Sequence, residues 1–367
     1  MSPQSPGFKK NDYRRDYRTW YSERPLSIEQ SKVLLRCSCS DGGFMNIVVL
    51  DGFTLNPGDL SWKRLEDMGK LTVYDRTSDS DIISRGREAV VILTNKTPLS
   101  ADVIAELPEL KYVGVLATGY NVVDVEAAAK RGIPVTNVPT YGTTAVAQMV
   151  FAHILEHCHH VKDHSDAVKA GEWNDQPDFC FWNFPLFELA EKTLGIVGFG
   201  RIGRQVGIIG SSFGMRVRAA DSVHVDPPTE IGDFGWLKVD DLFTASDVVS
   251  LNCPLFPETE GMVNTERLEL MKPTAILVNA SRGGLVIDED LAAALNSGRI
   301  AGASLDVVSN SEPPDPNNPL LSARNCFITP HIAWAAKESR ERLMATAMDN
   351  IQAFIDGNPQ NVVNGAR

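Results

Sequence analysis

Thr193-Leu-Gly-Ile-Val-Gly-Phe-Gly-Arg-Ile-Gly203 carries the strongest structural signal in this chain. Its first five residues are mostly apolar, which predicts a short buried strand, and residues 204–213 predict the helix that follows. Between the two stands G-x-G-x-x-G, a pattern that in this strand-to-helix setting is typical of a dinucleotide-binding turn. Gly198 would make the tight turn, Gly200 would let the backbone approach a pyrophosphate, and Gly203 would let the helix pack closely on the strand. Unpaired amides and a partial positive charge at the start of the helix would hold the phosphates.

The next predicted strand, residues 215–220, ends at Asp221, where dinucleotide-binding units carry the acid that hydrogen-bonds the adenosine ribose. A 2′-phosphate would meet a like charge there, at a cost of about 4 kcal/mol for unit charges ~4 Å apart in a dielectric of about 20. The sequence therefore predicts NAD rather than NADP. Arg218 lies close in sequence and could soften this preference, although strand alternation need not aim it at the ribose. The alternative for the whole motif is a glycine turn in an α/β protein that binds no nucleotide.

Short apolar runs alternate with helical stretches on both sides of this motif. Residues 46–50, 89–93 and 111–116 predict buried strands, and residues 125–131 predict a helix. The same alternation continues as far as His331, which favours parallel β-α-β units over hairpins. With 367 residues, at roughly 150 per domain, the chain should hold about two domains.

Composition and charge exclude several classes of protein. Hydrophobic residues make up 43% and charged residues 22%, an ordinary globular mixture, and no apolar stretch approaches the ~18–20 residues of a membrane helix. The net charge of −12 repels phosphate backbones, so we expect no nucleic-acid partner, and we expect no membrane partner either. The six cysteines form neither a disulfide framework nor a paired C-x-x-C zinc site, which favours a reducing cytoplasm; they are Cys37, Cys39, Cys158, Cys180, Cys253 and Cys326.

Residues 1–44 differ from the rest of the chain. They carry eight Lys/Arg against five Asp/Glu, a net charge of +3, and are rich in Ser, Pro, Tyr and Arg. No apolar core of ~7–15 residues follows the basic residues, as a secretory signal requires. We predict a disordered extension without an assigned function. The alternatives are a docking arm and an upstream extension of a protein that begins at Met45.

Three charged or titratable side chains follow later strands. Arg282 leaves one strand beside two glycines, Glu312 comes soon after the strand that ends at Asp306, and His331 follows the last strand. Because open α/β sheets bind ligands at the carboxyl ends of their strands, we expect these side chains to lie together. An arginine suits a carboxylate, and a histidine with an acidic partner suits proton transfer. Each residue alone is more typical of a surface arginine, a loop glutamate or a histidine at a helix start.

From Met45 to its end, the chain resembles the D-isomer-specific 2-hydroxyacid dehydrogenase family. The motifs that carry the resemblance lie at residues 195–203, 251–259, 271–273, 278–284, 302–307 and 329–334. Within the family, the chain is most similar to the glycerate dehydrogenase (hydroxypyruvate reductase) branch, on residues 93–98, 117–124, 139–143, 178–182 and 331–334.

The resemblance implies an α/β fold of two Rossmann-like domains. Residues 45–140 plus 337–367 would form a split, flavodoxin-like substrate-binding domain. Residues 141–336 would form an inserted NAD-binding domain with a doubly wound parallel sheet. The resemblance further implies NAD as the cofactor, catalysis in the cleft between the domains, and a homodimer formed through the nucleotide domains.

The resemblance also implies roles for the site residues. Arg282 would hold the substrate carboxylate and polarise the 2-oxo group, His331 would exchange the proton, and Glu312 would pair with His331 and keep it protonated for reduction. The residues implied at the NAD site are Thr118, Gly198, Gly200, Arg201, Ile202, Gly203, Asp221, Cys253, Ala280, Ser281, Arg282, Asp306, His331 and Trp334. The backbone amides of Thr118 and Gly119, together with Asn95 and Lys96, would meet the substrate carboxylate that Arg282 holds.

One spacing departs from the family pattern. Asp306 and Glu312 stand one step further apart than the strand-end Asp and the catalytic Glu of the family, and the extra residue falls within 308–311. A loop bulge would absorb it and leave Glu312 facing His331. Without such a bulge, His331 would lose its partner.

A histidine-rich stretch offers a metal-site alternative. His153, Glu156 and His157 match H-x-x-E-H, a pattern associated with zinc peptidases. On a helix the two histidines would share a face, so the geometry would permit chelation. The apolar residues around them instead favour an amphipathic helix of the nucleotide domain, and we expect no metal.

The leading hypothesis is NADH-dependent reduction of hydroxypyruvate or glyoxylate, or oxidation of D-glycerate. Other D-2-hydroxyacid dehydrogenases, of the D-lactate or D-3-phosphoglycerate type, are alternatives. A phosphorylated substrate would need several cations near the carboxylate loop, where only Lys96 stands. A different class is a non-enzymatic, corepressor-like NAD(H) sensor, against which the retention of Arg282, Glu312 and His331 argues.

Overall fold

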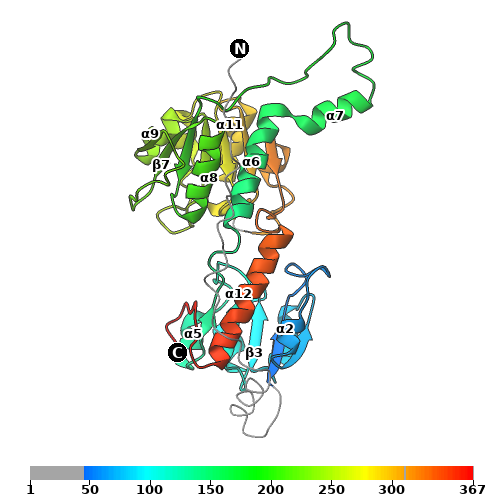
Figure 1. The fold of residues 1–367 in the computed structure, drawn as a ribbon, viewed down its shortest axis with the longest axis vertical. Helices are drawn as coiled ribbons and strands as arrows, with labels where there is room; N and C mark the ends of the chain where they lie inside the picture. Colours follow the sequence, from blue (N-terminus) through cyan, green and yellow to red (C-terminus); the bar gives the residue numbers. More distant parts are fainter. Residues whose placement is uncertain (1–44, 310, 367) are drawn as a thin grey trace, which may run out of the picture.

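The computed structural model describes residues 45–309 and 311–366. The predicted extension, residues 1–44, therefore lies outside the described residues. The described chain forms two parallel sheets in two lobes, one above the other in Figure 1. No helix in these residues is both long enough and apolar enough to cross a membrane.

The first sheet, in the lower lobe of Figure 1, has the strand order β2-β1-β3-β4-β5. Its strands are β1 (Asn46–Val49), β2 (Lys70–Val73), β3 (Val91–Thr94), β4 (Tyr112–Val115) and β5 (Val135–Thr136). The helical segments between them are α2 (Lys63–Glu66), η1 (Asp79–Asp81), α3 (Ile82–Gly86), α4 (Ala101–Ala105) and α5 (Val125–Lys130). All pairings are parallel, and this strand order is the flavodoxin-like one that we predicted.

The second sheet has the strand order β12-β11-β10-β9-β6-β7-β8, again with parallel pairings. Its strands are β6 (Thr193–Val197), β7 (Arg216–Ala220), β8 (Phe234–Trp236), β9 (Val248–Leu251), β10 (Ile276–Asn279), β11 (Gly302–Leu305) and β12 (Cys326–Ile328). The helical segments are α6 (Thr143–His159), α7 (Val161–Lys169), α8 (Arg201–Ser212), α9 (Val239–Ala245), α10 (Thr265–Leu270), η2 (Gly283–Leu285), α11 (Asp288–Asn296) and η3 (Pro319–Ser322). The order reverses between β6 and β9, so the sheet is doubly wound and the predicted fold class is confirmed.

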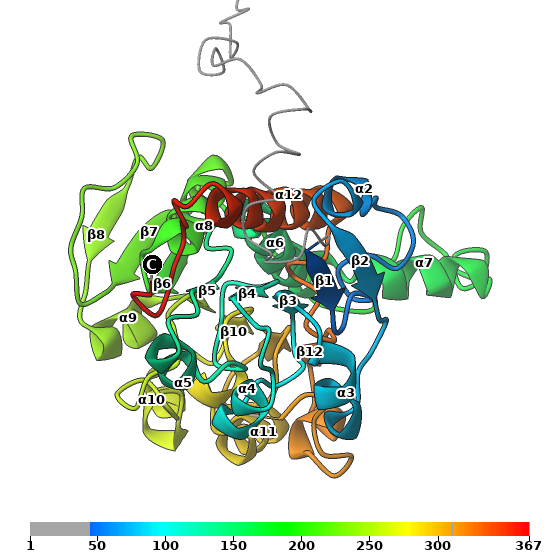
Figure 2. The same cartoon turned by 90° about the horizontal axis from the view of Figure 1, so that it is seen from below.

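Both sheets are covered by helices on their two faces, as Figure 2 shows for the first sheet, and the strand sequences agree with this. Every residue of β3, β4, β6, β9, β10 and β11 is buried, which explains why these strands are continuous apolar runs rather than alternating ones. Two core clusters flank each sheet. The carboxyl ends of the strands are consequently left as the place where polar loops gather.

The chain returns to the first sheet at its end. Helix α12 (Lys337–Ile355) buries Leu343 and Ile351 in the same core as Ile47 and Tyr112, and Figure 1 shows it running beside the lower lobe. Beyond the helix, the amide of Val363 donates to the carbonyl of Val135 at 2.8 Å. These contacts are those that a split substrate domain requires, while the predicted domain boundaries themselves stay a prediction.

One predicted boundary was wrong. We expected a helix over residues 204–213, whereas α8 begins at Arg201. Gly200 has an extended backbone and stands immediately before the first turn. A Cβ on Gly203 would lie 2.1 Å from the carbonyl oxygen of Gly198, so the last glycine of the motif is already packed inside the helix. The helix thus begins inside the glycine pattern, one turn earlier than the hydrophobic periodicity predicted.

Candidate active site

The carboxyl edges of the two sheets meet at one junction. Lys96, in the loop after β3, has its Nζ 3.8 Å from Oε2 of Glu312, in the loop after β11. A Cβ added to Gly119, after β4, would lie 3.3 Å from Nη2 of Arg282, after β10. Side chains that the sequence placed at strand ends in separate lobes therefore face one another across this junction.

His331 lies in the turn after β12, with a backbone φ of 54°. Its amide donates to the carbonyl of Asp306 at 2.8 Å, and its own carbonyl accepts from Nε1 of Trp334 at 2.9 Å. Nδ1 of the ring stands 2.7 Å from Oε2 of Glu312. Because Nδ1 is held by the carboxylate, Nε2 is the nitrogen that can exchange a proton with a ligand.

Asp306 builds the turn that carries His331. Its side chain is 1% exposed, and Oδ1 accepts from the Thr329 hydroxyl at 2.6 Å and from the amide of Ile332 at 2.9 Å. Oδ2 accepts from the amide of Ala333 at 2.8 Å. Both carboxylate oxygens of this predicted cofactor-lining residue are therefore engaged by the turn, beneath the histidine.

Glu312 reaches His331 despite the extra residue before it. Ser309 takes a φ of 58°, its hydroxyl bonds the carboxylate of Asp288, and Nδ2 of Asn318 donates to that hydroxyl at 2.8 Å. A Cβ on Gly283 would lie 1.8 Å from the carbonyl oxygen of Ser309, so the loop packs directly on the glycine. Glu312 thus contacts His331 although one extra residue precedes it, and Ser309 is held by these contacts.

The electrostatics of the junction favour a charged Glu312. The hydrogen bond from His331 lowers the pKa of the Glu312 carboxyl against the opposing effect of its partial burial, and the positive charges of Lys96 and Arg282 lower this pKa further. A carboxylate that stays ionised next to an imidazole stabilises the protonated ring. The junction therefore presents an ionised carboxylate to Nδ1 of His331.

Arg282 presents an exposed guanidinium at the end of β10. Nη1 donates to the carbonyl of Ser281 at 2.8 Å, and the backbone carbonyl of Arg282 accepts from Nδ2 of Asn279 at 2.8 Å. These local bonds fix the base of the side chain while Nη2 faces Gly119. A planar fork of donors held in this way suits the carboxylate of a small acid.

On the first sheet, Asp51 organises the loop after β3. Its Oδ1 accepts from the amide of Asn95 at 2.7 Å, and its Oδ2 accepts from the amides of Lys96 at 2.6 Å and Thr97 at 2.7 Å. Nδ2 of Asn95 donates to the Thr54 hydroxyl at 3.1 Å. The backbone amides of Asn95 and Lys96 are thus already bonded, and what the loop offers a ligand is its side chains.

Thr118 and Gly119 follow β4 at the same edge. The Thr118 hydroxyl donates to the carbonyl of Val138 at 2.8 Å, and the Thr118 carbonyl accepts from Nδ2 of Asn137 at 2.7 Å. The bonds fix the loop in front of Arg282. The predicted contact of this loop with a substrate carboxylate stays a prediction.

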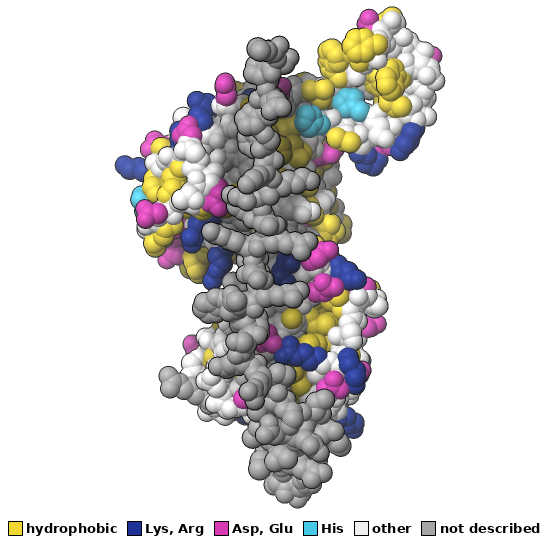
Figure 3. Space-filling view, in the orientation of Figure 1, with side chains coloured by type: hydrophobic (Ala, Val, Ile, Leu, Met, Phe, Trp, Pro, Cys, Tyr) yellow, Lys and Arg dark blue, Asp and Glu magenta, His cyan; other side chains and the backbone are white. Residues whose placement is uncertain are grey.

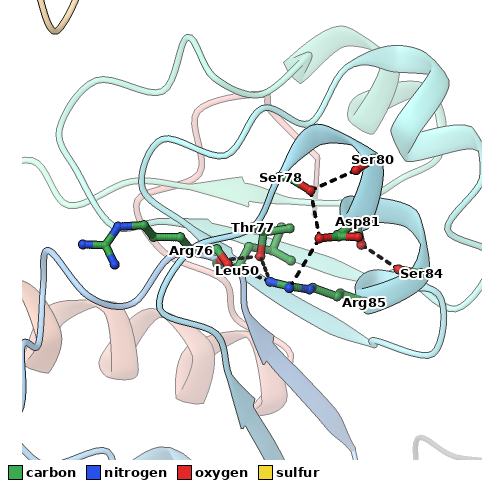
Figure 4. A network of polar contacts seen from close by, with 8 residues as sticks. All are labelled: Leu50, Arg76, Thr77, Ser78, Ser80, Asp81, Ser84 and Arg85. Atoms are coloured by element: carbon green, nitrogen blue, oxygen red, sulfur yellow. Dashed lines mark hydrogen bonds and ion pairs between the residues drawn. The ribbon is translucent and has the colours of Figure 1, made fainter.

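A polar network braces the neighbouring edge, after β1 and β2 (Figure 4). The Thr77 hydroxyl donates to the carbonyl of Leu50, and Nη1 of Arg85 donates to the Thr77 hydroxyl at 2.9 Å and to the carbonyl of Arg76 at 2.7 Å. The side chain of Arg76 leaves the network and stacks over the ring of Phe53, 4.2 Å from its centre. This network fixes the loops rather than supplying reacting groups.

The glycine turn has the shape that a dinucleotide needs. Gly198 has a φ of 88°, and a Cβ there would lie 2.6 Å from the amide nitrogen of Cys253. A Cβ on Gly203 would strike Gly198, as noted above, whereas one on Gly200 would meet nothing within 4 Å. The turn is therefore packed behind and open in front of the α8 start, which fits a pyrophosphate.

Asp221 stands at the end of β7, beside this turn. Its Oδ2 accepts from the amide of Phe199 at 2.6 Å, which ties it to the glycine motif. Arg218 is aimed elsewhere, because its Nη1 bonds the carboxylate of Asp233 at 2.8 Å. Arg218 is therefore engaged with Asp233 rather than with Asp221, and the preference for NAD over NADP stays a prediction.

Other predicted cofactor residues surround the same edge. The Ser281 hydroxyl bonds the carbonyl of Cys253, and the Cys253 thiol is buried with Sγ 3.8 Å from Sδ of Met262. Trp334 meets Tyr141 edge to face at 6.3 Å between ring centres. Three more are an exposed side chain at the α8 start and two partly buried ones against the core, namely Arg201, Ile202 and Ala280.

The histidines of the H-x-x-E-H stretch serve the core. Nε2 of His153 is 3.1 Å from the Thr329 hydroxyl, and Nε2 of His157 is 3.0 Å from the Ser304 hydroxyl. Burial lowers the pKa of His157 to about 4, so this ring is neutral. Both residues lie on α6 and face β11 and β12. This arrangement is the one expected of an amphipathic helix packed on the sheet of the nucleotide domain.

Sequence reasoning missed two contributions to the junction. Asp51 was not singled out, although an aspartate directly after a buried strand was a signal that could have found it. The contact of Lys96 with Glu312 could not be found at all, because it joins two lobes. An open dinucleotide turn beside a His–Glu pair and an exposed arginine defines the class of protein as a nicotinamide-dependent oxidoreductase.

The comparisons with known proteins agree with this class. The family model described as D-isomer specific 2-hydroxyacid dehydrogenase, NAD binding domain, matches residues 151–333. A hydroxypyruvate reductase of Blautia hydrogenotrophica is 53% identical over 323 residues, covering 87% of this chain and 100% of the relative. A glycerate dehydrogenase of Methylorubrum extorquens is 38% identical over 293 residues, covering 79% and 90%.

Solved structures show the same likeness. The crystal structure of D-lactate dehydrogenase from Aquifex aeolicus, complexed with NAD and lactic acid, superposes with a TM-score of 0.72 at 28% identity, covering 85% of this chain and 96% of that one. The chain belongs to the D-isomer-specific 2-hydroxyacid dehydrogenase family. It is an NAD-dependent oxidoreductase of 2-hydroxy acids.

Proposed function

We propose that the protein reduces hydroxypyruvate or glyoxylate with NADH at the junction of the two sheets, and oxidises D-glycerate in reverse. The observation that carries the proposal is the 2.7 Å contact of His331 Nδ1 with Glu312, at the junction that also presents Arg282. The 53% identity to a hydroxypyruvate reductase over its whole length supports this choice of substrates.

In this proposal the groups of the junction have distinct roles. Arg282 binds the substrate carboxylate and polarises the 2-oxo oxygen, with the loop of Thr118 and Gly119 closing the other side. Protonated His331 donates the Nε2 proton to that oxygen, and Glu312 stabilises the imidazolium beforehand. NADH, when bound, supplies the hydride for C2, so one hydride and one proton convert the 2-oxo group to an alcohol. Oxidation reverses each step, with neutral His331 accepting the hydroxyl proton.

The cofactor would occupy the open front of the glycine turn. Asp221 would bind the adenosine ribose, and the α8 start would bind the phosphates. The remaining proposed NAD contacts are the predicted set of Thr118, Gly198, Gly200, Arg201, Ile202, Gly203, Cys253, Ala280, Ser281, Arg282, Asp306, His331 and Trp334. In that set, Asp306 would act through the His331 turn, since its oxygens are engaged there.

The test is a panel of small 2-oxoacids assayed with NADH and with NADPH. We expect hydroxypyruvate and glyoxylate to have the highest kcat/KM, NADH to be preferred, and D-glycerate to be the product from hydroxypyruvate. Preference for pyruvate or for 3-phosphohydroxypyruvate would instead identify a D-lactate or a D-3-phosphoglycerate type of enzyme. Binding of NADH without turnover of any 2-oxoacid would contradict the enzymatic proposal and favour a sensor.

A homodimer is part of the proposal, and a projecting arm supports it. Helix α7 and the chain after it reach out from the upper lobe, and hydrophobic side chains gather on this arm in Figure 3. Its large exposed residues include Trp173 at 50%, Phe179 at 88%, Trp182 at 64% and Leu186 at 50%. Exposed aromatic clusters of this kind mark interfaces, and a second copy of this chain is the proposed partner.

Sedimentation of the wild type and of a Phe179→Glu, Trp182→Glu double variant tests the dimer. We expect a dimer and a monomer respectively, whereas a monomeric wild type would contradict the proposal.

We also propose the cytoplasm as the compartment. In the described residues the cysteines Cys158, Cys180, Cys253 and Cys326 are free thiols, which suits a reducing environment.

A further inference from the structure

Lys96 and His331 share one carboxylate oxygen. Oε2 of Glu312 is 2.7 Å from Nδ1 of His331 and 3.8 Å from Nζ of Lys96. The lysine comes from the loop after β3 on the first sheet, whereas the other two residues belong to loops of the second sheet. One acceptor atom thus serves two positive groups from different lobes when the ring is protonated.

The backbone of Lys96 is held in place for this contact. The Asp51 carboxylate accepts the amides of residues 95, 96 and 97, and the Thr94 hydroxyl donates to the carbonyl of Thr97 at 2.7 Å. With its amide bonded to Asp51, Lys96 can reach a ligand or the opposite lobe only through its side chain. That side chain is 67% exposed and crosses the junction to Glu312.

We propose that Lys96 is a positioning residue that modulates His331, the proton donor of the reaction. Its ion pair with Glu312 weakens the attraction between that carboxylate and the imidazolium, so the proton is released more easily. The inference rests on the proposed function, because the proton in question is the one that His331 donates to the 2-oxo oxygen. It assigns Lys96 to the proton donor rather than to the substrate carboxylate, which remains with Arg282.

Among the charged groups around Glu312 and His331, Lys96 is the one whose charge can be removed without disturbing the His331 turn. Arg282 also adds positive charge at the junction, from the loop after β10, and it is committed to the substrate. Asp306 lies under the turn with both oxygens bonded, and the buried His153 stands behind it on α6. Lys96 reaches the pair from the opposite lobe and is free of any role in holding the turn, so removing its charge leaves the His331 scaffold intact.

The experiment compares the wild type with Lys96→Met in the pH dependence of kcat/KM for hydroxypyruvate reduction. Loss of the cation strengthens the Glu312–His331 pair, so we expect the alkaline limb of the profile to move up by about half a pH unit at low salt. The acid limb of D-glycerate oxidation should move up by the same amount, because it reports the same proton. At ~1 M salt, where the Debye length is about 3 Å, the two profiles should converge.

Matched variants control for charge and for substrate binding. Lys96→Arg keeps the cation and should restore the wild-type profile. Lys130→Met removes an exposed lysine on α5, away from the junction, and should move neither limb. If Lys96→Met leaves both limbs in place and raises the KM for hydroxypyruvate about fivefold or more, Lys96 binds the substrate directly and the proposal is overturned. Unchanged limbs with an unchanged KM overturn it as well.

An NMR titration separates this inference from the proposed function. The ring of His331, assigned by its loss in His331→Asn, is titrated in the wild type and in Lys96→Met without substrate. We expect the ring to hold its proton to a higher pH in Lys96→Met, whether or not the protein turns over hydroxypyruvate. Absence of turnover together with this shift would overturn the function and leave the coupling standing. Identical titrations would overturn the coupling.

Discussion

Two aspartates at strand ends do similar work on the two sheets, and they differ in burial. Asp51, after β1, accepts three backbone amides from the loop that carries Lys96, and it is half-buried. Asp306, after β11, accepts two amides and a hydroxyl from the turn that carries His331, and it is 1% exposed.

The difference in burial between Asp51 and Asp306 makes one edge of the junction more rigid than the other. A fully buried carboxylate can be satisfied only by the donors around it, so Asp306 and the His331 turn must form together. Water can replace part of what Asp51 provides, so the loop of Lys96 has room to adjust. The edge that carries His331 is fixed rigidly, and the edge that carries Lys96 is fixed more loosely.

The largest effect should come from Asp306→Ala. It leaves the Thr329 hydroxyl, the buried amide of Ala333 and the part-buried amide of Ile332 without their acceptor, so we expect the free energy of unfolding to fall by about 3–5 kcal/mol. Hydroxypyruvate reduction should fall at least ~1000-fold, because His331 loses its turn. Urea denaturation and NADH oxidation measure both. Asp349→Ala, which removes an exposed partner of Arg64, should cost no more than about 1 kcal/mol. Equal losses in the two variants would show that Asp306 stabilises the fold no more than an exposed aspartate does.

Two glycine variants of the dinucleotide turn should distinguish a loss of packing from a loss of cofactor binding. Gly203→Ala places a Cβ against the carbonyl of Gly198, so we expect a loss of about 2 kcal/mol in stability together with loss of NADH binding. Gly200→Ala meets no protein atom within 4 Å, so stability should hold while the Kd for NADH rises about tenfold. Thermal unfolding and fluorescence titration with NADH give the two readouts. Unchanged NADH affinity in Gly200→Ala would show that the phosphates lie elsewhere.

Glu312→Gln should cost about 30-fold in kcat for reduction near neutral pH, because the imidazolium loses its charged partner. Its alkaline limb should move down by about one pH unit, opposite in sign to Lys96→Met. Since the folded pKa of Glu312 is lowered, the pair's contribution to stability is fully present above the ordinary carboxyl pKa of 4.5 and is lost as the pH falls through the lower folded value. Urea midpoints at a series of acid pH values should show this loss in the wild type and not in Glu312→Gln. A limb that stays in place would contradict the role of the pair.

The smallest effect should come from Asp51→Ala. The loop of Lys96 loses a half-buried acceptor, so we expect about 1 kcal/mol of lost stability and a KM for hydroxypyruvate that rises about fivefold, with kcat nearly unchanged. Steady-state kinetics and urea denaturation measure both quantities. A kcat as low as that of Asp306→Ala would show that the two edges are equally demanding.

Local sequence carried much of the fold and part of the site. Strands and turns depend mainly on residues that are neighbours in the sequence. The apolar runs, the glycine pattern and Asp221 were therefore enough to predict parallel sheets and a nucleotide turn. Arg282, Glu312 and His331 were predicted together because strand ends in one parallel sheet meet at one edge.

What the sequence did not predict depends on long-range contacts. The direction of Arg218 is set by Asp233, 15 residues away, and the amides that Asp51 binds lie 44 to 46 residues further along. The approach of Lys96 to Glu312 joins two sheets, and no local pattern reports how two lobes sit against each other. The start of α8 was missed because its first turn consists of the glycine motif itself.

We propose that the imidazole of residue 331 passes the proton, and that the NADH contacts other than His331 suffice to bind the nucleotide. The most direct measurement is single-turnover hydride transfer from NADH to hydroxypyruvate in His331→Asn, with NADH affinity measured in parallel. We predict a rate at least ~1000-fold below the wild type, with the Kd for NADH changed by no more than about twofold. A His331→Asn variant that keeps a rate within about tenfold of the wild type would contradict the account.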